Sequence, residues 1–325
     1  MKYEAWFTTI LMVICSFIVT GFLLQGCQTS CKEVKMNFKE SGEHLECIFD
    51  YYTAYGIMTD PGEHVSLYQD LPSEIPKLCK VVQGVMIHVF HAHRHGVRLS
   101  DERRKEVQIR RVEDMLARIK ELDERPVIFE RDADRRVVGN CRDFSLLLCS
   151  LLRHEGIPAR ARCGFSRYFT RGRYEDHWIC EFWNAEEDRW VQVDAQLDDL
   201  QREAFAIEFD PYDVPRNEFL PAGEVWRLCR TEKLNPDLCG IMDLKGLWFV
   251  RGNVVRDFMA LNNLELLPWD CNELMDISDD KLTQDDYTLL DRVAELTTKG
   301  NRSFLETRSL FESNAAVRMP DEWEP

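Results

Sequence analysis

The sequence has no excess of positive charge. Its 325 residues include 41 Lys and Arg against 57 Asp and Glu, which gives a formal net charge of −16. Proteins that follow the phosphate backbone of a nucleic acid depend on Lys and Arg to neutralise it. We therefore expect no nucleic-acid partner. Glycine and proline are also scarce, at 16 and 12 residues, and this composition excludes a collagen-like chain.

A disulfide framework is also missing. Three of the twelve cysteines precede residue 36, and the remaining nine show no regular spacing. An odd number of cysteines cannot all pair within one chain. We therefore expect buried, reduced thiols and exclude a small disulfide-stapled scaffold. With 45% hydrophobic and 30% charged residues, the chain has an ordinary globular composition, long enough for a sizeable core.

Charge is absent from one long stretch near the N-terminus. Residues 5–26 contain no charged side chain, and the run is about as long as a membrane-spanning helix. A retained anchor is favoured over a cleaved signal peptide, whose apolar stretch is shorter. Leu24-Gln25-Gly26-Cys27 also resembles a lipoprotein cleavage box, which would place the bulk outside. Lysines after the run instead favour a cytoplasmic bulk. Translation from Met36 would leave a cytoplasmic chain without this segment.

The rest of the chain divides into three parts by pattern. Residues 36–135 are predicted to be mainly helical, and residues 201–325 to form a helical cap with an acidic tail. Between them, residues 136–200 predict one strong helix followed by three antiparallel strands. The helix starts near Cys141 and ends at Gly156 and Pro158. The strands cover the sequences ARARCGFSRYF, HWICEFW and RWVQVDAQL. This order predicts an α+β fold.

Cys141 is predicted to lie at the first position of that helix. Unsatisfied backbone N–H groups at a helix start stabilise a thiolate, so we expect a lowered pKa for this cysteine. His177 opens the second strand, and Asp194 lies in the third. If Trp183 faces Asp188 across the hairpin, His177 and Asp194 become direct cross-strand neighbours. The aspartate would then orient the imidazole toward a thiol.

The order of these three residues along the chain resembles that of a known protein family. The segment 139–195 resembles the catalytic core of the transglutaminase-like superfamily, the circularly rearranged relatives of papain. The matching stretches are GNCRDFS, LLRHEGIPARARCGF, the His177-Trp178 pair and WVQVD, residues 190–194. The resemblance implies that Cys141 is the nucleophile, His177 the base and acid, and Asp194 the orienting carboxylate. The family more often has proline after the aspartate, where this chain has Ala195.

This resemblance implies a thiol enzyme that acts on amide bonds of peptides or proteins. A thioester on Cys141 would be resolved by water or by an amine, and hydrolysis is favoured because no dedicated amine site is evident. No cofactor or metal is expected. The oxyanion hole would use the Cys141 backbone N–H, with Gln83 and Asn140 as candidates for a second donor.

Two other interpretations stay open. The first is a catalytically silent scaffold of the same fold that binds peptides or proteins. The second is a metal-binding membrane protein that uses His88, His91, His93 and His95. On a strand the last three of these would share one face. A zinc site needs three or four convergent ligands, and we expect packed or solvated histidines instead.

Overall fold

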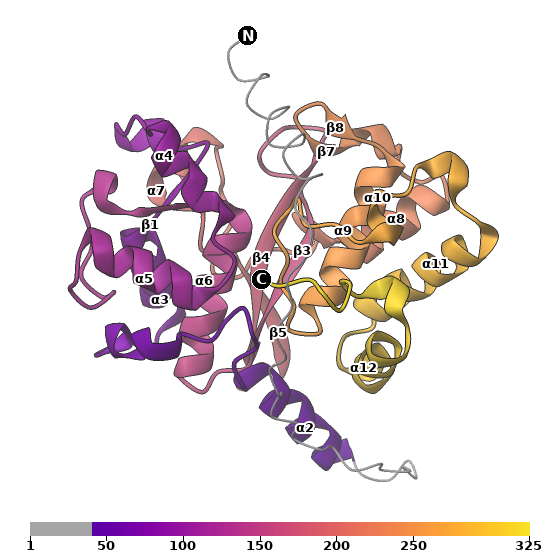
Figure 1. Cartoon of the computed structure of the whole chain (residues 1–325), viewed down its shortest axis with the longest axis horizontal. Coiled ribbons are helices and arrows are strands. Elements are labelled where there is room, and N and C mark those ends of the chain that lie inside the picture. The colour runs from indigo at the N-terminus through magenta and orange to yellow at the C-terminus, as the bar shows by residue number, and fades with distance from the viewer. Residues whose placement is uncertain (1–40) are drawn as a thin grey trace. The chain divides into compact units, whose positions relative to one another are not determined.

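The computed structural model describes residues 41–325 (Figure 1). The predicted anchor or signal segment, residues 1–35, lies outside the described residues. The first part of the described chain is mainly helical, as its pattern predicts. Its elements are α2 (Ser41–Thr53), α3 (Ile75–Val85), β1 (Met86–His88), α4 (Asp101–Arg104), α5 (Val112–Leu122) and β2 (Val137–Gly139).

One long helix and three strands follow in the predicted order. They are α6 (Cys141–His154), β3 (Ala159–Ser166), β4 (Tyr174–Asn184) and β5 (Arg189–Val193). The remaining elements are α7 (Asp199–Ala204), β6 (Phe219–Pro221), α8 (Ala222–Arg230), β7 (Cys239–Ile241), β8 (Leu244–Lys245), α9 (Leu247–Ala260), α10 (Glu273–Asp276), α11 (Gln284–Thr298) and α12 (Phe304–Ser313).

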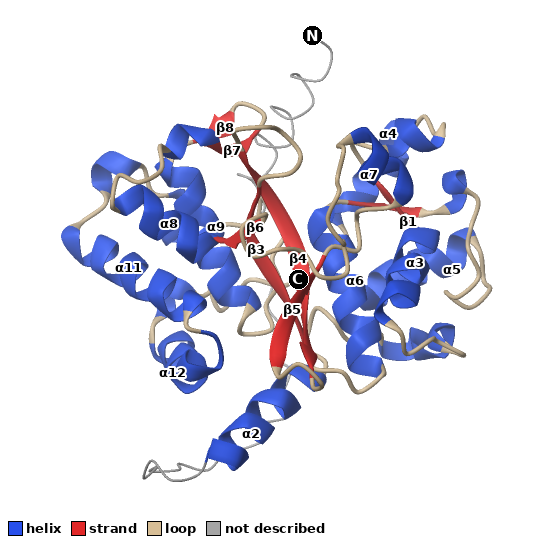
Figure 2. Cartoon of the chain, turned by 180° about the vertical axis from the view of Figure 1, so that it is seen from behind, coloured by secondary structure: helices blue, strands red, loops and turns tan. Residues whose placement is uncertain are grey.

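The strands form a central layer between two groups of helices. Figure 2 shows β3, β4 and β5 with α3 to α7 on one side and α8 to α12 on the other. Along the sheet the order is β6-β3-β4-β7-β8, and β5 pairs with β4 as well. β1 and β2 form a separate parallel pair. Helices and a mainly antiparallel sheet therefore share one core, which confirms the α+β prediction.

One edge of β4 has a gap in its strand partners. Residues 180–184 pair with β5, and residues 174–175 pair with β7. Residues 176–179, which include His177 and Trp178, have a partner only on the β3 side among the described strands. Backbone N–H groups that no strand takes up need other acceptors. The gap therefore leaves β4 open to contacts from the helix packed beside it, α6.

Local sequence explains where α6 begins and ends. Asn140 caps its first turn, with the side-chain oxygen accepting the Arg142 backbone N–H at 2.9 Å. Asp143 closes a capping box by accepting the Asn140 backbone N–H at 2.9 Å. At the other end Gly156 has φ of +73°, a left-handed conformation that favours glycine. Both ends agree with the prediction and fix Cys141 at the first helical position.

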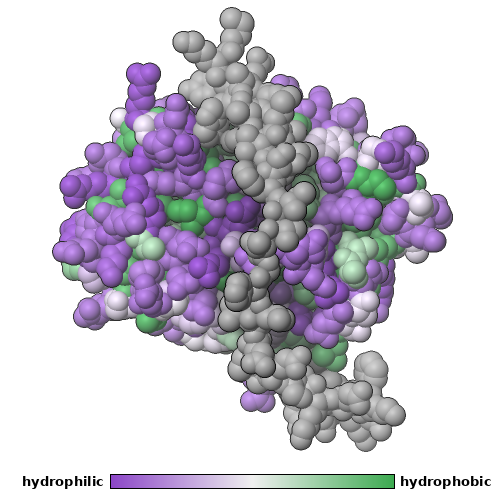
Figure 3. Space-filling model, viewed as in Figure 1, coloured by the Kyte–Doolittle hydropathy of each residue, from purple (hydrophilic) through white to green (hydrophobic). Residues whose placement is uncertain are grey.

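None of the helices in residues 41–325 is both long enough and apolar enough to cross a membrane. On the described surface seen in Figure 3, hydrophilic side chains predominate over scattered apolar ones.

Candidate active site

His177 and Asp194 form the polar centre of the site. The Nε2 atom of His177, on β4, is 2.7 Å from Oδ2 of Asp194, and both side chains are buried. The same Oδ2 atom accepts the Tyr168 hydroxyl at 2.7 Å. Oδ1 accepts the backbone N–H of Gln196 at 3.0 Å. The carboxylate therefore fixes the imidazole ring through Nε2 and leaves Nδ1 of His177 for another partner.

The predicted contact between His177 and Asp194 is present, but the predicted register is wrong. Trp183 pairs with Trp190 and not with Asp188. Asp188 instead lies in the loop between the strands, with φ of +53°. The pairing is thus shifted by two residues, and a shift by two keeps every side chain on its face. Asp194 follows the end of β5 instead of lying within it.

Cys141 reaches β4 at its open edge. The thiol accepts a hydrogen bond from the backbone N–H of Trp178, the residue after His177. Cys141 is half-buried and is the first residue of α6. Its own backbone N–H has no preceding helical turn to supply an acceptor. The structure therefore brings the sulfur beside the strand residue that follows the imidazole, with a backbone donor next to it.

The acidity of Cys141 differs from the sequence expectation. Burial raises the pKa of the Cys141 thiol well above its ordinary value, and the carboxylates of Asp176, Asp143 and Asp194 act in the same direction. The Trp178 N–H lowers the pKa but does not outweigh them. The expected lowering was based on the helix start and left out burial. Desolvation penalises the charged form of a thiol, so the raised pKa favours the neutral form of Cys141.

Aromatic rings flank the imidazole of His177. Ring centroids of Tyr168 and Phe169 lie 5.8 Å and 5.0 Å from it, both edge-on. The strand predicted for ARARCGFSRYF included both residues, whereas β3 ends at Ser166. Sequence reasoning therefore missed Tyr168 as a partner of Asp194. The only indication in the sequence was an aromatic pair that precedes a polar loop.

The four clustered histidines do not converge. His88 ends β1, and residues 92–95 form a 3₁₀ helix instead of the strand that would align the histidines. The ring of His88 stacks on His91 with centroids 4.7 Å apart, while His95 pairs with Asp198 at 2.9 Å. Within residues 41–325, no three His, Cys, Asp or Glu side chains could hold a metal ion together.

The two candidates for a second oxyanion donor have different surroundings. Gln83 donates its side-chain N–H to the carbonyl of Ala195 at 3.1 Å. That bond uses one of the two amide N–H groups and ties the side chain to the segment after Asp194. Asn140 is buried, and its Nδ2 atom has no hydrogen-bond partner in the described part of the chain. Within the described residues Gln83 thus keeps one free amide N–H, and Asn140 keeps two.

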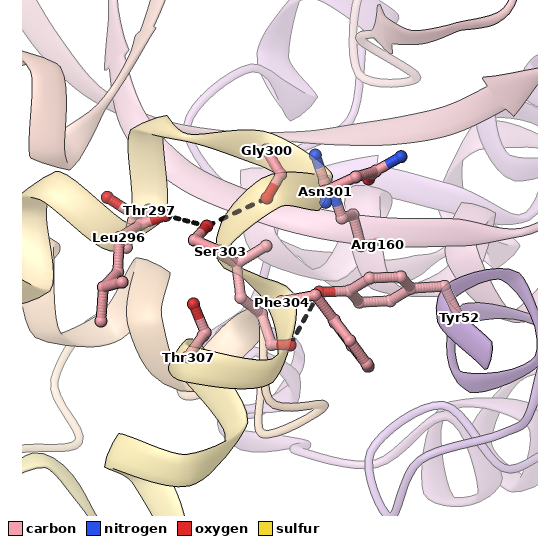
Figure 4. Close-up of a pocket in the computed structure, with 10 residues that line it drawn as sticks. Tyr52, Arg160, Leu296, Thr297, Gly300, Asn301, Ser303, Phe304 and Thr307 are labelled. Atoms are coloured by element: carbon pink, nitrogen blue, oxygen red, sulfur yellow. Dashed lines mark hydrogen bonds between the residues drawn. The ribbon is translucent and has the colours of Figure 1, made fainter. Parts of the chain in front are cut away.

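A small cavity elsewhere in the molecule does not belong to this site. It lies among α11, α12 and the start of β3, and its volume is about 10 Å³ (Figure 4). Ser303 donates there to the Leu296 and Gly300 carbonyls, and Tyr52 donates to Leu261 at 2.9 Å. This space is about that of one water molecule, and none of the predicted site residues lines it.

Comparison with known families agrees with the geometry. Residues 96–195 match the family model of the transglutaminase-like superfamily. The chain therefore contains a transglutaminase-like domain, and the predicted resemblance is confirmed. The match begins within the predicted N-terminal helical region and ends just after Asp194. Comparison with curated proteins and with solved structures gave no match.

Proposed function

We propose that this protein is a thiol enzyme that cleaves or transfers acyl groups at amide bonds of peptides or proteins, with hydrolysis favoured. The observation that carries the proposal is a pair of contacts at the open edge of β4. The Cys141 thiol accepts the Trp178 N–H, and His177 is held by Asp194 at 2.7 Å. The transglutaminase-like domain at residues 96–195 supports this class of chemistry.

In the first half of the reaction Cys141 attacks the amide carbonyl. The sulfur–carbon bond forms, the carbonyl electron pair moves onto oxygen, and the thiol proton passes to Nδ1 of His177. Asp194 stabilises the resulting imidazolium through Nε2. Because burial raises the pKa of Cys141, the proton leaves during the attack and not before it. His177 is therefore a general base in this scheme.

In the second half the tetrahedral adduct collapses. The carbon–nitrogen bond breaks, and His177 returns its proton to the departing amine, which leaves a thioester on Cys141. A water molecule then gives its proton to His177 and attacks the thioester, which releases a carboxylic acid and restores the thiol. An amine in place of water would complete a transfer. Both outcomes use the same three side chains.

Selective alkylation tests the proposal. Iodoacetamide near neutral pH should modify Cys141 faster than exposed Cys271. In the proposed scheme His177 takes up the Cys141 proton as the sulfur attacks, which offsets the raised pKa of the buried thiol. Peptide mapping by mass spectrometry locates the label, and a 4-nitrophenyl acetate burst measures acylation of the same residue. The C141A variant should lose the burst, whereas the matched control C271S should keep it.

Two results would count against the enzyme. If Cys141 reacts no faster than Cys271, and C141A gives the same burst as the unaltered protein, the thiol has no base. The chain would then be the catalytically silent scaffold of the transglutaminase-like fold. Labelling of Cys141 that is slowed by H177A but not by H93A would identify His177 as the base.

A further inference from the structure

His88 lies beside the start of α6. β1 and β2 are parallel, and His88 pairs with Gly139, two residues before Cys141. Its ring centroid is 6.2 Å from that of Phe144. Phe144 is three residues after Cys141, so the two project from the same face of the helix. A buried imidazole thus stands next to the helix face that carries the sulfur.

The hydrogen bonding of His88 fixes its tautomer. Nδ1 is 3.2 Å from the backbone N–H of Phe90. An amide N–H can only donate, so Nδ1 carries a lone pair, and a neutral ring then bears its proton on Nε2. Burial lowers the pKa of His88 well below its ordinary value, with further lowering from His91 and His177. The ring is therefore neutral, and its Nε2–H has no acceptor among the described residues.

A chain of aromatic contacts links His88 to His177. From His88 the ring stack continues to His91 at 4.7 Å, then to Phe205 at 5.4 Å. Phe205 contacts Phe169 at 5.0 Å, and Phe169 contacts His177 at 5.0 Å. The chain joins the buried imidazoles of His88 and His177, and the backbone N–H of the residue after His177, Trp178, donates to the Cys141 thiol. A hydrogen bond made there is stronger than one in bulk solvent.

We propose that the Nε2–H of His88 is the second donor of the oxyanion hole, together with the backbone N–H of Cys141. This assignment rests on the proposed function, because an oxyanion forms only if Cys141 attacks a carbonyl. The two donors would stabilise the negative oxygen more than the neutral carbonyl. His88 is thus assigned a catalytic role, whereas the other three clustered histidines are not.

His88 fits this role better than Asn140 or Gln83. Gln83 uses one of its two amide N–H groups to bind the Ala195 carbonyl, so its amide is tied to the segment after Asp194. Asn140 also has an Nδ2 atom without a partner among the described residues, but its side chain is committed to capping α6 through the Arg142 N–H. His88 combines a fixed tautomer, an unused proton and a position on the Cys141 side of α6.

The test separates alkylation from acylation. Iodoacetamide alkylates sulfur by direct displacement and creates no oxyanion, whereas 4-nitrophenyl acetate passes through a tetrahedral oxyanion. Replacing His88 with Phe keeps an aromatic ring but removes the donor. We expect H88F to lower the acylation rate on the order of 100-fold, with the alkylation rate of Cys141 changed less than about threefold. H88Q restores an N–H donor, and its acylation rate should be about tenfold higher than that of H88F.

Each outcome of this test leads to a different conclusion. H93F changes an exposed histidine of the same cluster and should leave both rates unaltered, and circular dichroism checks that each variant folds. Equal acylation by H88F and the unaltered protein would overturn the assignment. A parallel fall in acylation and alkylation would also overturn it, because His88 would then act on the thiol itself. Loss of acylation in N140A alone would assign the donor to Asn140. Absence of both reactions in the unaltered protein would instead refute the proposed function.

Discussion

The two ends of the β3–β4 hairpin bury polar groups in opposite ways. At one end Glu181 lies between Arg160 at 2.7 Å and Arg162 at 3.0 Å, and Arg216 adds a contact at 2.8 Å. Arg162 also makes two bonds of 2.9 Å to Asp257 of α9. At the other end His177 and Asp194 share one bond, beside the Cys141 thiol.

The difference lies in how completely the charges are matched. Burial alone would raise the pKa of Glu181, but Arg162, Arg160 and Arg216 hold it well below its ordinary value. Burial dominates at Cys141, where desolvation raises the pKa and the carboxylates of Asp176, Asp143 and Asp194 raise it further. A fully paired cluster has no group left to react. The site end keeps an unpaired nitrogen and an unionised thiol, as proton transfer requires.

The largest effect is expected from Asp194→Asn. An amide accepts a proton poorly from Nε2 and favours the wrong imidazole tautomer, so His177 could no longer take the thiol proton through Nδ1. We expect the acylation rate with 4-nitrophenyl acetate to fall on the order of 10³-fold. The unfolding free energy measured in urea serves as the control. If the acylation rate falls by less than about threefold, Asp194 does not orient His177 for proton transfer, and the described difference between the two ends of the hairpin is wrong.

Glu181→Gln should destabilise the fold at the end of the hairpin that carries the arginine cluster. Removing the carboxylate charge leaves Arg160 and Arg162 buried without that partner, and this costs about 3 kcal/mol of unfolding free energy. Acylation per folded molecule should stay within about twofold, because Glu181 does not contact the site. E187Q, in the exposed loop between β4 and β5, is the matched control and should change stability by less than about 0.5 kcal/mol. Equal stabilities of E181Q and E187Q would contradict the pairing.

The pH dependence of stability should follow the same cluster. Glu181 has a lowered pKa in the folded state, so the folded chain holds its proton less tightly than the unfolded chain. Its contribution is complete above the unfolded value of about 4.3 and is lost as the pH falls below it. Urea titrations between pH 6 and pH 3 should therefore show a smaller acid-induced loss in E181Q. An identical loss in both proteins would exclude Glu181 as the responsible group.

Tyr168→Phe should have the smallest effect, at the end of the hairpin that carries His177. The hydroxyl donates to Asp194 Oδ2 at 2.7 Å, the oxygen that also bonds His177. Its removal takes one of three donors from the carboxylate, and we expect about a tenfold slower acylation. A merely structural role would not move the pH–rate profile, whereas a role through Asp194 shifts the apparent pKa of the rate upward. An unchanged profile would limit Tyr168 to packing.

Helix boundaries and strand faces were within reach of sequence reasoning. The α6 termini follow from a capping box at Asn140 and a left-handed Gly156, which are interactions within a few residues. His177 and Asp194 share a face because side chains alternate with a period of two. A register error of two residues left that conclusion intact. The hairpin register itself depends on the conformation of the loop, including Asp188, which the pattern did not specify.

By itself the sequence determined the α+β class, the order of the catalytic candidates and the helix start at Cys141. Only the tertiary structure decided the Tyr168 contact, the raised pKa of Cys141 and the place of His88 beside α6. Periodicity and capping act between neighbours in the chain, so residue order is enough to predict them. Desolvation and hydrogen bonds between distant segments depend on which surfaces the folded chain brings together, and no local pattern contains that information.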